Sequence, residues 1–167
     1  MNFRSLGALV AATLAGCAVE PGRPAVPEPW YPPVNENSDP LLAAFEGRVP
    51  CAEPAMKDCE KVKVGLALYQ DPGTKSPTTY TLARVYVASS PEGSRVVVSG
   101  TWRITQGMRL DPSAPVYRLD ASAPSEFRSY WAIGEDILFV LDEDMKPRVG
   151  TASWSYVLNR TRSQGHE

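Results

Sequence analysis

The sequence has little of what catalytic and cofactor sites are usually built from. The 167-residue chain contains three cysteines and one histidine, His166, which lies in the terminal stretch "RTRSQGHE". A Ser-His-Asp or Cys-His catalytic site would have to use that histidine. A zinc site near the cysteines would lack the nearby histidine or second cysteine pair needed for four ligands. The chain also has no glycine-rich phosphate loop. We therefore expect no enzyme.

The chain also lacks an excess of positive charge. Its formal net charge is −2 at pH 7. Proteins that bind nucleic acid usually carry a basic excess, because they neutralise phosphates. The charge balance therefore argues against nucleic acid as a partner.

No hydrophobic run is long enough to span a membrane as a helix. The apolar stretch near the N-terminus is short and is followed by small residues, so residues 1–16 are predicted to be a lipoprotein signal peptide. The following "LAGC" (residues 14–17) resembles a bacterial lipobox, in which Cys17 is lipidated and becomes the first mature residue; an ordinary cleavage site is the alternative. Ala18 follows, rather than the aspartate that usually retains lipoproteins in the inner membrane. We expect a lipid-anchored, periplasm-facing outer-membrane protein whose N-terminal lipid binds the membrane.

Residues 17–40 are rich in proline. Seven prolines fall from Pro21 to Pro40, which excludes a helix or a central strand there. This composition predicts an extended, stiff tether between the lipidated cysteine and the folded part. A proline-rich docking segment anchored by Trp30 and Tyr31 is the alternative.

Residues 41–160 show the period of two that is typical of β-strands. In "KVKVGLALY", for example, Val62, Val64, Leu66 and Leu68 share one face. Short connections, including the predicted hairpin turns "SSPEG" (89–93), "GED" (134–136) and "DEDMKP" (142–147), favour a meander of about eight strands. A sheet of that length tends to close, so we predict an all-β fold: a small antiparallel barrel, followed by a flexible tail at residues 161–167. The eight expected strands lie within 43–50, 61–69, 78–88, 94–105, 115–120, 127–134, 136–144 and 151–159.

Several of these segments carry a resemblance. The stretch "FEGRVPCAEPAMKDCEKVKVGLALYQDPGTKSPTTYTL" resembles the start of the NlpE-type copper-resistance lipoproteins, and "GTWRI" and "IGEDILFVLDEDMKP" resemble later strands of the same N-terminal domain. The resemblance covers about residues 45–160. It implies a lipocalin-like barrel on an outer-membrane lipoprotein that is linked to copper tolerance, surface adhesion and envelope-stress signalling.

The sequence departs from that family in two ways. The family loop is Cys-x-x-Cys, whereas seven residues separate Cys51 from Cys59 here. We also expect the chain to end soon after the barrel, so that any activity of a second domain found in some relatives does not transfer.

The loop between Cys51 and Cys59 leaves three interpretations open. A disulfide would staple the loop and contribute roughly 2–3 kcal/mol. Alternatively, the two thiolates and the thioether of Met56 would form a soft site for Cu(I), the candidate cofactor that the resemblance favours. In the third interpretation the pair is a redox sensor, with Lys57 lowering a thiol pKa slightly. Glu53 and Asp58 are hard ligands, better interpreted as solvated loop charges.

A competing function places the site inside the barrel. An eight-stranded barrel can hold one small ligand. A lipocalin-like carrier or scaffold would bind a small apolar molecule or a partner protein of unknown identity, with a cavity lined by residues such as Trp102 and Trp131 and the cysteines serving only as a staple.

Overall fold

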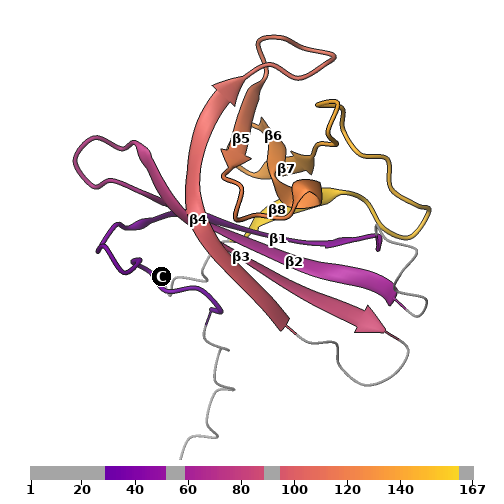
Figure 1. The fold of residues 1–167 in the computed structure, drawn as a ribbon, viewed down its shortest axis with the longest axis horizontal. Helices are drawn as coiled ribbons and strands as arrows, with labels where there is room; N and C mark the ends of the chain where they lie inside the picture. Colours follow the sequence, from indigo (N-terminus) through magenta and orange to yellow (C-terminus); the bar gives the residue numbers. More distant parts are fainter. Residues whose placement is uncertain (1–28, 52–58, 89–94, 162–167) are drawn as a thin grey trace, which may run out of the picture.

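The structure is a computed structural model that describes residues 29–51, 59–88 and 95–161. It is an all-β antiparallel barrel in which each strand pairs with the next and β1 also pairs with β8, as predicted from the sequence (Figure 1). The long strands β1–β4 form a strongly twisted sheet, and the short strands β5–β8 close it. The elements in chain order are β1 (Leu41–Val49), β2 (Cys59–Gln70), β3 (Pro77–Ala88), β4 (Arg95–Gln106), β5 (Pro115–Leu119), the 3-10 helix η1 (Ser125–Phe127), β6 (Ser129–Ile133), β7 (Ile137–Val140) and β8 (Val157–Thr161).

The last predicted strand begins later than the sequence pattern indicates. Residues 151–156 form a loop instead, and β8 starts only at Val157. The hydroxyl of Thr151 accepts hydrogen bonds from the backbone N–H groups of Ser153 (3.3 Å) and Trp154 (3.1 Å). A side-chain turn of this kind competes with pairing in a sheet, which explains why alternation alone misplaced the start of the strand.

Two of the predicted turns lie within the described residues, and both are present in the structure. Gly134, with φ +58°, adopts the left-handed conformation that glycine tolerates best, between β6 and β7. The "DEDMKP" stretch is a tight hairpin, in which the N–H of Asp142 donates to the carbonyl of Lys146 (2.8 Å) and Leu141 bridges to Pro147. The predicted "SSPEG" turn lies outside the described residues, as does most of the predicted tail.

The barrel interior is filled with side chains. The main core cluster contains the alternating residues of β2, Val62 to Leu68, together with inward-facing residues of the other strands. Leu66 and Leu68 are fully buried. Alternation along β2 therefore predicted its inner face correctly.

The outer face of the sheet is covered over part of β1 and β2. Residues 29–40 pack there rather than extending away as a tether: Tyr31 contacts Ala44, Ala67 and Tyr69 in a second cluster, and Trp30 joins its edge. The prolines remove backbone donors, but their carbonyls still accept hydrogen bonds from the barrel. The predicted tether at 17–28 lies outside the described residues.

Where β4 is not paired with β5, a side chain forms hydrogen bonds with its edge. β5 pairs with β4 only from Trp102 to Gln106. Just before that point, the carboxylate of Asp120 accepts hydrogen bonds from the N–H of Thr101 (2.7 Å) and from its hydroxyl (3.0 Å). The Thr101 backbone bond is the main reason that the pKa of Asp120 falls to about 2. Asp120 thus continues the pairing of β4 with a side chain where the strand β5 ends.

Candidate functional site

The two loop cysteines lie where neighbouring strands meet at one end of the barrel. Val49 of β1 is paired with Val62 of β2, so Cys51, two residues beyond Val49, comes close to Cys59, which opens β2. The two cysteines form a disulfide with a Cα–Cα distance of 6.1 Å. That distance lies within the usual range for disulfides. The strand register therefore brings the two sulfurs together despite the longer loop.

The disulfide is only partly exposed and rests on the barrel. Cys51 and Cys59 both pack against the main core cluster, and Pro50 beside them is buried. The nearby ammonium of Lys61 forms an ion pair with Glu60 (2.9 Å). The disulfide is therefore attached directly to the packed core at this end of the barrel.

The structure bears on the three interpretations of the loop. The sulfurs of Cys51 and Cys59 are bonded to each other, so in this state neither is a thiolate. In the part of the chain that the structure describes, no group of three or more His, Cys, Asp or Glu side chains could hold a metal ion. Met56, Glu53, Lys57 and Asp58 lie outside the described residues, as do Cys17 and His166.

The two tryptophans proposed to line an internal cavity are not brought together. Trp102 belongs to the main core, where its indole N–H donates to the carbonyl of Tyr69 (2.8 Å) and its ring contacts Tyr117. Trp131 instead packs at the edge of a separate cluster formed by Met108, Ala114, Val116 and Leu141. Its strand neighbour Tyr130 faces the main core, which places Trp131 on the other side of the sheet.

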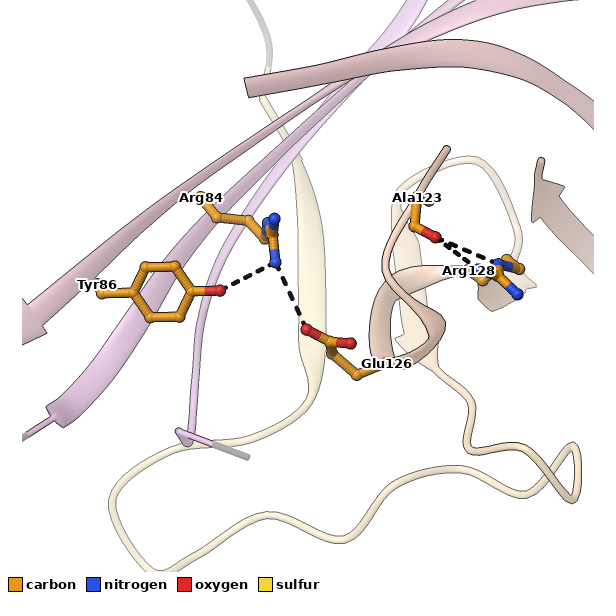
Figure 2. A network of polar contacts seen from close by, with 5 residues as sticks. All are labelled: Arg84, Tyr86, Ala123, Glu126 and Arg128. Carbon is orange, nitrogen blue, oxygen red and sulfur yellow. Dashed lines mark hydrogen bonds and ion pairs between the residues drawn. The ribbon is translucent and has the colours of Figure 1, made fainter. Parts of the chain in front are cut away.

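Sequence reasoning missed a buried charged contact inside the barrel. Arg84 lies on β3 and is only 9% exposed, and its guanidinium donates to the hydroxyl of Tyr86 (2.9 Å) and to the carboxylate of Glu126 (3.5 Å) (Figure 2). Glu126 belongs to η1, so the ion pair links η1 to β3. The period of two places Arg84 on the same face as Tyr80 and Leu82; an arginine in that row was the available signal.

The phenol of Tyr130 lies deeper still in the same interior. It is fully buried, and its hydroxyl has no hydrogen-bond partner among the described residues. Burial is the main reason that its pKa is raised, because the phenolate would lose its hydration. Tyr80, which donates to Asp120 (3.3 Å), has its pKa raised to about 12, again chiefly by burial. Both phenols therefore stay neutral around neutral pH.

A family model, the NlpE N-terminal domain, matches residues 45–151, well over half of the chain. The chain belongs to the NlpE N-terminal domain family. Its members are copper-resistance and envelope-stress lipoproteins. The curated proteins and the solved structures that were compared with the chain contain no match.

The matched segment of this NlpE-family chain contains both loop cysteines and strands β2 to β7, but not β8 or residues 29–40. Within the described residues, no helix has the length and apolar character needed to cross a membrane.

Proposed function

We propose that this chain is an outer-membrane lipoprotein of the copper and envelope-stress response, in which Cys51 and Cys59 are the responsive pair. Family membership supports the general role. The observation that carries the finer proposal is the placement of both cysteines by paired strands, with a Cα–Cα distance of 6.1 Å. This placement persists as long as β1 and β2 stay paired, whatever the state of the sulfurs.

The donor set decides when copper can bind. A disulfide offers no thiolate, so the oxidised pair does not suit Cu(I). Transfer of two electrons and two protons from a dithiol breaks the S–S bond, leaves two Cys thiols and converts the dithiol into its own disulfide. On losing their protons, Cys51 and Cys59 become soft donors of the type that selects Cu(I), and Met56 is the proposed third ligand. The proposed function therefore couples copper binding to reduction.

The same redox step changes the stability of this end of the barrel. A disulfide that closes so short a loop contributes about 2–3 kcal/mol, mainly by restricting the unfolded chain. Because the disulfide links the end of β1 to the start of β2, reduction should increase local opening at Cys51 and Cys59 while the paired parts of the two strands are retained. A loosened end of this kind is a change that an envelope partner could detect.

Thiol alkylation followed by mass spectrometry tests the copper proposal. Full-length protein extracted from its membrane is alkylated as isolated, after reduction, and after reduction with one equivalent of Cu(I). We expect no labelling as isolated, double labelling after reduction, and at least tenfold slower labelling with Cu(I). Met56→Leu should weaken this protection, while Met108→Leu, a similar change in a separate cluster, should not.

Two results would count against this proposal. If Cu(I) left the reduced cysteines equally reactive, the pair would not be a copper site. If the disulfide also resisted excess dithiol in the folded protein, the pair would be a permanent staple.

The membrane anchor is tested separately. Cys17→Ser should abolish incorporation of radiolabelled palmitate and move the protein from the membrane to the soluble fraction, because the acyl chains supply the membrane affinity. A folded protein that stayed in the membrane fraction would contradict the proposed anchor. Cys51→Ser serves as the control, since it removes a cysteine without removing the lipid.

A further inference from the structure

The outer face of the barrel carries a groove that the cysteine chemistry does not use. It has a volume of about 440 Å³ and lies between residues 29–40 and the loop before β8. Its floor includes the small residues Gly65 and Ala83, and two tryptophans, Trp30 and Trp154, line it. The volume lies in the range of small-molecule sites.

The small residues Gly65 and Ala83 leave room for the groove above the sheet. A Cβ on Gly65 would overlap the indole of Trp30, so this position accepts only glycine without moving the ring. Trp30 is held by a hydrogen bond from its indole N–H to the carboxylate of Glu46 (2.6 Å) and by Tyr31, whose ring meets it edge-on. The ring at this side of the groove is therefore fixed in place before any ligand arrives.

The charge lining the groove is mostly positive. Arg48, Lys63 and Arg95 line it, and Glu46, the one carboxylate of the lining among residues 29–51, 59–88 and 95–161, is already bonded to Trp30. In the described part of the chain, none of these three cations takes part in an ion pair. The chain as a whole has a net charge of −2. The groove is thus a local cationic site on a slightly acidic protein.

Both indoles of the groove also contact cations. The guanidinium of Arg95, which lines the groove, lies over the ring of Trp30 (5.7 Å to the centroid). The ring of Trp154 contacts the ammonium of Lys61 (4.6 Å), which is paired with Glu60 beside the groove. Each contact places a positive charge beside a flat apolar surface. A ligand that offers an apolar body next to an acidic group would satisfy both features at once.

We propose that this groove binds a small, soluble anionic amphiphile, with its apolar ring or chain against the indoles and its carboxylate, sulfonate or phosphate group between the cations. Both tryptophans lie outside residues 45–151, whereas the three cations lie within them, so the family match covers only part of the groove. The proposal does not depend on the state of Cys51 and Cys59.

A pair of fluorescent probes tests the proposal on the full-length protein. Anilinonaphthalene sulfonate carries an apolar ring body and one negative charge, and N-phenylnaphthylamine has the same rings without the charge. We expect one sulfonate probe to bind per chain, at least tenfold more tightly than the neutral probe. Decanoate should displace it, whereas decanol should not.

Charge reversal provides the matched variants. Lys63→Glu should weaken binding of the sulfonate probe about five- to tenfold, since it replaces an attraction with a repulsion near the protein surface. Lys75→Glu makes the same change at an exposed position in the turn between β2 and β3, away from the groove, and should leave binding unchanged. Near-ultraviolet circular dichroism must match between variants, because partly unfolded proteins also bind this probe.

Trp154→Leu supplies a second, independent variant. It removes one indole from the lining without changing charge and should weaken both probes. Equal affinity for the two probes, or equal effects of Lys63→Glu and Lys75→Glu, would overturn the proposal. Absence of binding by the folded wild-type protein would overturn it as well.

Discussion

The outer face of β2 is closed near one end of the strand and open near the other. Towards the turn to β3, Ala67 and Tyr69 are buried beneath Tyr31 although they point away from the barrel core. Towards the cysteines, Lys63 on the same face is exposed and borders the groove. The same strand and the same period thus give a second core at one end and a cationic surface at the other.

The difference comes from residues that precede the barrel. The hydroxyl of Tyr69 donates to the carbonyl of Pro32 (3.0 Å), and the backbone N–H of Leu41 donates to the carbonyl of Pro33 (2.9 Å). Proline cannot donate a backbone hydrogen bond but accepts one like any other residue. A proline-rich segment can therefore cover a sheet face without adding a strand to it.

The largest expected effect concerns the inner face of β2. Leu66→Ala should lower the free energy of unfolding by about 3 kcal/mol, because the side chain is fully buried in the main core and its removal leaves a cavity. Lys63→Ala, three residues away on the open outer face, should change it by less than about 0.5 kcal/mol. Urea unfolding measures both. Similar losses in the two variants would mean that the open end of β2 is as tightly packed as the core.

A smaller loss is expected where residues 29–40 cover the outer face. Tyr31→Ala should cost about 2 kcal/mol, because it uncovers Ala67 and removes the contact of the Tyr31 hydroxyl with Thr161 (3.2 Å). Val34→Ala in the same segment is the control, since Val34 is 47% exposed. If Tyr31→Ala cost no more than Val34→Ala in urea unfolding, the cover would contribute nothing to stability and the comparison would fail.

Sequence alternation was sufficient to predict the barrel but not its cover. Inward rows such as Val62 to Leu68 follow directly from the period of two, because each strand must bury one face. The burial of Ala67 and Tyr69 did not follow, since it depends on a segment whose prolines indicated only that it could not form a helix or a central strand. Trp30 and Tyr31 were considered as docking anchors only in the alternative to a tether, and no pattern indicated that they pack on their own barrel.

The cysteine site was only partly predicted, because its geometry also depends on contacts between segments that are distant in the sequence. The residues themselves indicated that Cys51 and Cys59 belong together, yet whether the two sulfurs can form a disulfide depends on the distance between two strand ends. That distance is set by the pairing of β1 with β2, which spacing alone does not reveal. The contact of Arg84 with Glu126 was missed because its partner lies 42 residues away on a short helix.

The smallest expected effect is a pH dependence of the free energy of unfolding that arises at the covered end of β2. The pKa of Tyr69 is raised above its ordinary value of 10.0, mainly by burial and further by Tyr31, while a hydrogen bond with Thr81 opposes the change. Because the folded state prefers the neutral phenol, the stabilisation from Tyr69 is complete below pH 10 and is lost as the pH rises through the raised value. Tyr69→Phe should cost about 1 kcal/mol at neutral pH, because it removes the hydrogen bonds of the phenol, including the one to the carbonyl of Pro32. In urea unfolding at increasing alkaline pH, the free energy of unfolding of the wild-type protein should fall towards that of the variant. Parallel profiles would mean that the phenol ionises without disturbing the cover. Convergence would show that the neutral phenol of Tyr69 helps to hold residues 29–40 on the barrel.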